Sequence, residues 1–141
     1  MFQKILFPTD GSEHSEKARP FAVDLAKLTG ATIVVMHAFQ SPLTLRKRGA
    51  IMLEELKTTI EEDAKEFVSE EVTAVQTAGV SATALLVEGS AAEGILRAIE
   101  EEQPDLVVMG SRGGGGLPGL RLGSVAEQIV RHSAVPVLVV K

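Results

Sequence analysis

The feature that most restricts the fold of this chain is a regular alternation of two hydrophobic patterns. Five short apolar runs have the character of buried strands, and they cover residues 4–10, 31–39, 80–89, 104–110 and 134–141. Four segments with helical spacing separate these runs, at residues 12–30, 52–78, 90–103 and 124–133. Strands that alternate with helices in this way predict parallel strands joined by right-handed crossovers. We therefore expect an α/β fold, a doubly wound five-stranded parallel sheet with helices on both faces, in a single domain over residues 1–141.

The first expected helix has an apolar stripe and one irregularity. Its apolar residues at helical spacing are Ala18, Phe21, Leu25 and Leu28. Gly30 stands at a C-cap position and is expected to end the helix. Pro20 lies inside the segment, and proline is tolerated only near a helix N-terminus. We expect Pro20 either to kink the first turns or to delay the regular start.

Two later helices begin with the pattern of a capping box, in which a serine is followed three residues later by a glutamate. Ser90 and Glu93 have this spacing at the start of the third helix. Ser124 and Glu127 have it at the start of the last one. The pattern predicts both serines as N-caps.

The composition argues against several classes of protein. Hydrophobic residues make up 45% of the chain and charged residues 23%, as in ordinary soluble globular proteins. The net charge of −5 disfavours nucleic acid or an anionic membrane as a partner. Without cysteine there is no disulfide framework and no thiolate metal site. The N-terminus lacks the pattern of a secretion signal, and no apolar run approaches the roughly 18 residues that span a bilayer. We therefore expect a cytoplasmic protein.

A glycine-rich stretch follows the fourth expected strand, at residues 110–123, and contains four consecutive glycines, Gly113–Gly116. An open parallel sheet binds ligands beyond the carboxyl ends of its strands, where the strand order reverses. This rule selects three places in the chain: residues 8–12, 37–40 and 110–124. The glycine-rich stretch is one of the three.

The chemistry of the glycine-rich stretch suits an anion. A run of glycines can turn consecutive N–H groups inward around a phosphate. The helix expected at Ser124 adds free N–H groups and the positive end of its dipole. Arg112 and Arg121 are the cations of the stretch. These features favour a phosphate-bearing ligand, with a flexible surface loop as the alternative.

Better-known phosphate motifs do not fit. Gly114, Gly116 and Gly119 satisfy G-x-G-x-x-G, but a dinucleotide site needs an acidic residue about 20 positions further, and no acid follows Glu127. The P-loop needs a lysine that reaches the outer phosphates, and the glycine-rich stretch has none. No G-x-S-x-G nucleophile elbow is present either.

The sequence gives little indication of a catalytic or metal site. Asp10, Ser12 and His14 lie within one turn, whereas catalytic triads are assembled from residues held apart on a scaffold. The simpler interpretation is that Asp10 or Ser12 caps the first helix and that His14 faces solvent. His37 and His132 are isolated, so the histidines predict no metal site.

The spacing of the glycines resembles a known family motif. Gly110-x-x-Gly113, nine residues and then Gly123-Ser124 match the nucleotide motif G-2x-G-9x-G-[S/T] of the universal stress protein family. The segment ILFPTDGSEHSEKA resembles the first strand and turn of that family, and VVMHAF resembles its second strand. DLVVMGSRG and GSVAEQIVRHSAVPVLVV resemble its final third. The resemblance covers nearly the whole chain.

The resemblance implies a fold and a ligand. The fold is a sheet in the order 3-2-1-4-5, and the ligand is ATP together with Mg²⁺. Carried over by position, the adenine and ribose end of the site would be formed by Pro8, Thr9 and Asp10, with a backbone contact from Ala38. Asp10 would hydrogen-bond the ribose hydroxyls or help to place the nucleotide-bound Mg²⁺.

The same carry-over implies a phosphate end. Gly110, Ser111, Arg112 and Gly113 would begin the phosphate loop. Gly123, Ser124 and Val125 would then bring the triphosphate onto the helix N-terminus.

The resemblance also implies a homodimer paired through the last strand, at residues 136–140. The sequence supports this interpretation independently, because VPVLVV would be an apolar and uncharged sheet edge, which soluble proteins usually protect. Only Pro136 and Lys141 blunt this edge. We expect the last strands to pair antiparallel across a two-fold axis.

The features of the loop, together with the resemblance, imply an ATP-binding regulatory protein of the stress response, in which the nucleotide changes the surface offered to a protein partner that the sequence does not identify. No acid or base is evidently placed to activate water, and no Walker lysine is present. Any enzymatic activity is therefore expected to be at most slow ATP hydrolysis. A slow ATPase or phosphotransferase, and a nucleotide-independent interaction module, stay open as alternatives.

Overall fold

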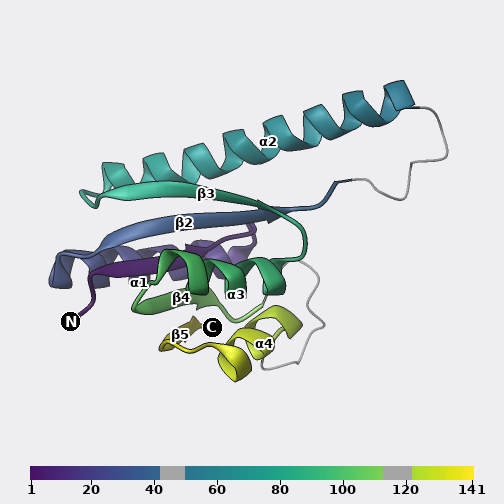
Figure 1. The fold of residues 1–141 in the computed structure, drawn as a ribbon. Helices are drawn as coiled ribbons and strands as arrows, with labels where there is room; N and C mark the ends of the chain where they lie inside the picture. Colours follow the sequence, from purple (N-terminus) through teal and green to yellow (C-terminus); the bar gives the residue numbers. More distant parts are fainter. Residues whose placement is uncertain (42–49, 113–121) are drawn as a thin grey trace.

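The computed structural model describes residues 1–41, 50–112 and 122–141, and it places five parallel strands in one sheet (Figure 1). The strands are β1 (Lys4–Pro8), β2 (Thr32–Phe39), β3 (Ala82–Glu88), β4 (Leu106–Gly110) and β5 (Val137–Val140). The helices are α1 (Glu13–Thr29), α2 (Ala50–Thr77), α3 (Ala91–Glu102) and α4 (Ser124–His132). The strand order is β3-β2-β1-β4-β5, so the predicted α/β fold and its order are confirmed.

Helices cover both faces of the sheet because the strands are apolar on both sides. In β1, Ile5 and Phe7 belong to the core cluster under α1 and α2, whereas Leu6 belongs to the cluster under α3 and α4. This alternation follows from the two-residue period of a strand. Val107 in β4 is likewise fully buried on the α3 and α4 side, and Val108 on the other. β1 and β4 are therefore enclosed from both sides, as expected for a parallel sheet.

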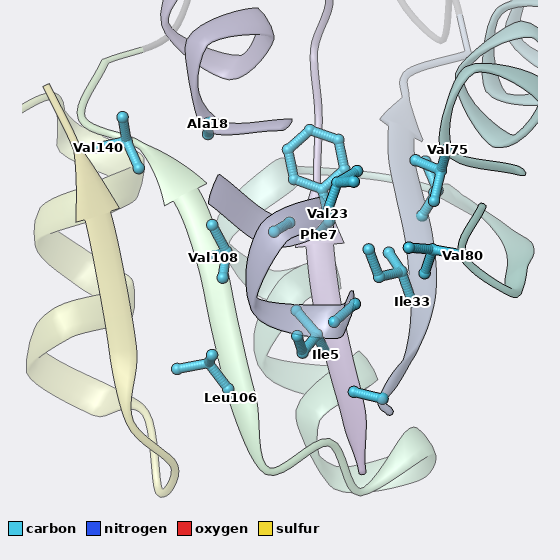
Figure 2. Packing of buried hydrophobic residues seen from close by; sticks show 14 of the residues in the cluster. Ile5, Phe7, Ala18, Val23, Ile33, Val75, Val80, Leu106, Val108 and Val140 are labelled. Carbon is cyan, nitrogen blue, oxygen red and sulfur yellow. The ribbon is translucent and has the colours of Figure 1, made fainter. Parts of the chain in front are cut away.

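Figure 2 shows the cluster on the side of α1 and α2. Leu106 and Val108 on β4, Ile5 and Phe7 on β1 and Ile33 on β2 point to the same side of the sheet. Val75 from α2 packs against the same cluster. Phe7 is fully buried at its centre and is the largest of the completely buried side chains in the described residues.

The first helix differs from its prediction in two ways. α1 begins at Glu13 and continues through Pro20, so the expected delay of its start is wrong. The predicted stripe is also wrong in part, because Phe21 is 52% exposed and Leu28 is 83% exposed. α1 instead turns small residues toward the sheet, namely Ser15, Ala18, Ala22, Val23 and Ala26. Small side chains let the helix approach the strands closely. Leu25 is partly buried and packs against the core, as predicted, whereas Phe21 and Leu28 lie outside the contact.

The two predicted capping boxes have different outcomes. Ser90 is the N-cap of α3, and its hydroxyl accepts a hydrogen bond from the backbone N–H of Glu93. The corresponding prediction for Ser124 is wrong, because Gly123 is the N-cap of α4 and Ser124 is the first helical residue. Glu127 is paired with Arg131 at 3.0 Å and does not reach back to the cap.

No helix in the described part of the chain is both long and apolar enough to cross a membrane.

The central position of Phe7 gives a prediction for stability. The variant Phe7→Ala leaves a cavity in the cluster that the sheet forms with α1 and α2, and it should lower the free energy of unfolding by about 3–5 kcal/mol. Leu28→Ala removes a mostly exposed side chain and should change it by less than about 0.5 kcal/mol. Urea denaturation of both variants measures the difference. Equal losses would contradict this description of the core.

Candidate functional site

An open pocket lies at the carboxyl edge of the sheet, with about 540 Å³ of space that is partly open to solvent. The ends of three strands and the residues after them form its floor: Pro8, Thr9 and Asp10 at β1, Met36 and Ala38 at β2, and Met109, Gly110 and Arg112 at β4. The strand order reverses between β1 and β4. The pocket therefore lies where an open α/β sheet is expected to bind a ligand.

Three helices complete the wall of the pocket. α1 contributes Ser15 from its first turn, and α3 contributes Ala91 and Ile95. α4 contributes Val125 and Ala126, also from its first turn. The amino ends of these helices therefore lie next to the carboxyl ends of the strands.

The turn after β1 is held from two sides. The backbone N–H of Thr9 donates to the carbonyl oxygen of Met36 at 2.8 Å, and His37 Nδ1 donates to the carbonyl oxygen of Thr9 at 2.9 Å. The His37 ring packs against Phe67 of α2, with 4.6 Å between ring centroids. Gly11 follows with φ +78°, and a Cβ there would lie 3.2 Å from the Phe67 ring. A glycine at this position therefore satisfies both the left-handed backbone and the close aromatic contact.

The first turn of α1 forms a small hydrogen-bond network with Asp10. Ser12 is the N-cap and accepts from the backbone N–H of Ser15 at 3.3 Å, so the interpretation of Ser12 as a cap is confirmed. Asp10 Oδ1 accepts from the Ser12 N–H and from the Ser15 hydroxyl, each at 2.9 Å. The expectation that His14 faces solvent is wrong. His14 is half-buried, and among the described residues its buried Nδ1 has no hydrogen-bond partner.

Gly110 brings the end of β4 against this first turn. A Cβ on Gly110 would lie 2.7 Å from the carbonyl carbon of His14, 2.8 Å from its oxygen and 2.9 Å from the backbone nitrogen of Ser15. These are backbone atoms, so they cannot move aside as the end of a flexible side chain can. The predicted site residue Gly110 is therefore required for packing, whatever binds nearby.

The two ends of the glycine-rich stretch are joined by one hydrogen bond. The N–H of Gly123 donates to the carbonyl oxygen of Ser111 at 2.7 Å. Ser111 is only 2% exposed, and its own N–H donates to the carbonyl oxygen of Val140 in β5 at 2.8 Å. The first turn of α4 begins immediately after this contact, and the first N–H groups of a helix have no partner within it. Such a helix end favours an anion.

The structure thus brings most of the predicted site residues together. The predicted residues that line the pocket are Pro8, Thr9, Asp10, Ala38, Gly110, Arg112 and Val125. Ser111, Gly123 and Ser124 lie beside them in the base of the glycine-rich stretch and at the start of α4. Gly113 and Arg121 lie outside the described residues. The contact of each residue with a ligand stays a prediction.

Several residues that line the pocket could not be recognised as site residues from the sequence. Met36, Ala91, Ile95, Met109 and Ala126 are apolar, and in the sequence they are indistinguishable from core residues. Ser15 is different, because it is a polar residue at a position of α1 that turns toward the sheet. A polar residue among apolar ones on this helix face is the sequence feature that could have indicated Ser15 as a site residue.

The fold and the pocket define a doubly wound α/β protein with an open pocket at the reversal of strand order. The universal stress protein family model matches residues 1–141, so the chain belongs to this family. It is 38% identical over 141 residues to a universal stress protein of Thermus aquaticus, with all of both chains covered. It is also similar to the solved structure of protein MJ0577, a universal stress protein of Methanocaldococcus jannaschii. The two structures match with a TM-score of 0.87 and 32% sequence identity. The match covers 100% of this chain and 96% of the MJ0577 chain.

More distant structures of the family share the fold and were solved with adenine nucleotides. A universal stress protein in complex with cAMP has a TM-score of 0.72 and 24% identity, covering 99% of this chain and 96% of its own. A family member from Arabidopsis thaliana with AMP bound has a TM-score of 0.73 and 17% identity. The match covers 99% of this chain and 91% of the Arabidopsis chain.

The packing of Gly110 leads to a second stability prediction. Gly110→Ala forces a methyl group against three backbone atoms and should lower the free energy of unfolding by about 1–3 kcal/mol. Gly94→Ala is the matched control in α3, where the new methyl group would meet side-chain atoms only, the flexible end of Met36 at 3.0 Å and Val87 Cγ1 at 3.2 Å. Its cost should be offset by the higher helix propensity of alanine, about 1 kcal/mol. Urea denaturation that ranks Gly94→Ala as the more harmful change would contradict the assigned role of Gly110.

Proposed function

We propose that this universal stress protein is a cytoplasmic regulatory protein that binds an adenine nucleotide, ATP with Mg²⁺, in the pocket between β1 and β4. The observation that carries the proposal is the combination of two unlike surfaces in one pocket. One part of the wall is apolar, and the other part ends at the first turn of α4, next to the hydrogen-bonded base of the glycine-rich stretch. A nucleotide has the same division between an apolar base and a charged phosphate chain.

The apolar part suits the adenine ring. Met36, Ala38 and Ile95 offer aliphatic surface for a planar base, and ligand sites of this kind are mostly apolar with a few placed polar groups. Thr9 and Asp10 supply polar groups at the edge of this surface, where the ribose would lie. We assign the adenine and ribose end of the site to Pro8, Thr9, Asp10 and Ala38.

The other part suits the phosphates. The first N–H groups of α4 and its positive dipole end favour negative charge, and Arg112 brings a cation to the pocket wall. We assign the phosphate end to Gly110, Ser111, Arg112, Gly113, Gly123, Ser124 and Val125. Mg²⁺ is commonly held by substrate phosphates with one or two carboxylates. Asp10 is the carboxylate that the described pocket wall offers for this role, which is the alternative to its contact with the ribose hydroxyls.

The relatives support the class of ligand. Family members whose structures were solved with cAMP, dAMP and AMP have the fold of this chain. All three ligands contain adenine and at least one phosphate. The proposal of ATP rests on the glycine motif and on the two-part pocket of this chain. Occupation by nucleotide would change the surface offered to a protein partner.

Nucleotide binding is tested first by thermal unfolding and calorimetry with Mg²⁺. ATP at 100 times its Kd should stabilise the wild-type protein by about 2.7 kcal/mol. Gly123→Val places a branched side chain at the N-cap of α4, where the phosphates would approach, and should weaken ATP binding at least about tenfold. Its φ of −74° is accessible to valine, so the fold should survive.

Gly30→Ala is the matched control for this experiment. Gly30 is the C-cap of α1, at the amino edge of the sheet, and has φ +76°. Alanine there should cost about 1–2 kcal/mol of stability and leave ATP affinity unchanged. An unchanged affinity in Gly123→Val would refute the assigned phosphate end, and no ATP binding by the wild-type protein would refute the proposed function.

We also propose that the protein is a homodimer paired through β5, residues 136–140. β5 is an end strand of the sheet and pairs with β4. The carbonyl oxygens of Pro136 and Val140 accept hydrogen bonds from Val107 and Ser111. Because the backbone groups of alternate strand residues point to the same neighbour, those of Val139 point away from β4. An apolar edge with outward backbone groups supports pairing with a second copy.

Sedimentation at micromolar concentration tests the dimer. The wild-type protein should sediment with twice the mass of one chain. Val139→Pro removes an outward N–H from the edge and should give a monomer that keeps its ATP affinity. A monomeric wild-type protein would overturn the proposed pairing.

A further inference from the structure

We propose that Ser15 is a positioning residue that orients the Asp10 carboxylate toward the sugar hydroxyls of the bound nucleotide and thereby sets the preference for ribose. The inference rests on the proposed nucleotide binding and deepens it. Its evidence is the hydrogen-bond network of the first turn of α1 and the burial of the Ser15 hydroxyl at the pocket wall.

Ser15 is an exception in its surroundings. The other residues that α1 buries are Ala18, Ala22, Val23 and Ala26, all of them apolar. Alanine has a higher propensity than serine in the interior of a helix, so apolar packing against the sheet does not by itself select a serine at position 15. The serine is nevertheless 4% exposed, and its hydroxyl group must find partners there.

The partners of the Ser15 hydroxyl lead to the pocket. Its Oγ donates to Asp10 Oδ1 at 2.9 Å and lies 3.1 Å from the carbonyl oxygen of Ser12. The Ser12 N–H donates to the same oxygen of Asp10 at 2.9 Å. Two donors from one helical turn therefore converge on Oδ1. Both Ser15 and Asp10 line the pocket.

The distribution of buried polar residues points the same way. Among the described residues, the buried polar or charged side chains are Thr9, Ser15, Glu71 and Ser111. Glu71 is paired with Arg19 at 2.7 Å between α1 and α2. The other three lie at the pocket or at the base of the glycine-rich stretch. Burial of polar groups in this protein is thus concentrated where the ligand is proposed to bind.

A fixed carboxylate is what recognition of a sugar requires. Asp10 itself is exposed, and an exposed side chain without restraint loses rotamer freedom when it binds a ligand. The Ser15 hydroxyl restrains it before binding, together with the Ser12 N–H. A hydrogen bond from a ribose hydroxyl to a charged carboxylate contributes enough to change the affinity about tenfold or more. Ser15 would therefore act on the discrimination between ribose and deoxyribose, through Asp10.

Calorimetry with ATP, 2′-deoxy-ATP and 3′-deoxy-ATP in the presence of Mg²⁺ tests this role. The wild-type protein should bind at least one deoxy analogue roughly tenfold more weakly than ATP. Ser15→Ala should reduce this ratio to roughly threefold or less, and Asp10→Asn should do the same. The double variant should show no further reduction, because the serine acts through the aspartate. Ser15→Cys, with a weaker donor of similar size, should give an intermediate ratio.

Ala18→Gly is the matched control, because it weakens α1 one turn later and leaves the network intact. It should lower the melting temperature and keep the wild-type ratio. The positioning role would be overturned if Ser15→Ala kept the wild-type ratio of ATP affinity to deoxy-analogue affinity. It would also be overturned if the double variant reduced this ratio by the product of the two single reductions. Equal binding of ATP and both deoxy analogues by the wild-type protein would overturn it too, with nucleotide binding left standing. Failure of the wild-type protein to bind any of the three nucleotides would instead refute the proposed function.

Discussion

The geometry of the pocket depends on the close contact between the end of β4 and the first turn of α1. Gly110 lies so near the backbone of His14 and Ser15 that a Cβ would not fit between them. This contact fixes the distance between the β1–α1 turn, which carries Asp10, and the start of the glycine-rich stretch. Because the strands are parallel, their carboxyl ends already share one edge. The contact with α1 then determines how closely the groups at that edge approach one another.

The second constraint is the hydrogen bond from Gly123 to Ser111. It joins the residue after β4 to the N-cap of α4, so the direction of α4 is fixed by the sheet at this point. Ser111 is bound in turn to Val140, so β5 takes part in the same arrangement. The first N–H groups of α4 therefore have a fixed position relative to β4 and β5. A phosphate placed at this helix end would meet donors that need no rearrangement, which lowers the entropic cost of binding.

The fold was predictable from the sequence to a large extent, and the site only in part. Alternating strand and helix patterns fix the order of the elements, and the apolar character of β1 and β4 on both faces predicts a covered sheet. Sequence patterns for helix caps predicted the ends of the helices less well. Ser124 has the sequence of a cap, yet Gly123 is the N-cap of α4, and its N–H donates to the carbonyl oxygen of Ser111. The serine pattern in the sequence carries no information on this contact with a residue before the glycine-rich stretch.

The same limit explains which pocket residues escaped prediction. Motif spacing identifies both Gly110 and Gly123, and at Gly110 the close approach of other backbone atoms explains why the residue is glycine. Met36 and Ile95 line the pocket with side chains that would be equally suitable in the core, so their role arises only when strands and helices come together. Exposure of Phe21 has a related cause, because the approach of α1 to the sheet is set by its alanines.

The first turn of α1 shows two departures from what stability alone would select. Ser15 places a hydroxyl in a stripe of alanines, and His14 has a buried Nδ1 with no hydrogen-bond partner among the described residues. Sequences are usually consistent at all levels of structure, and exceptions concentrate at functional sites. Both exceptions lie where α1 meets Gly110, next to the pocket. The rest of the buried face of α1 is apolar and regular, so the irregular turn supports the proposed nucleotide site that it borders.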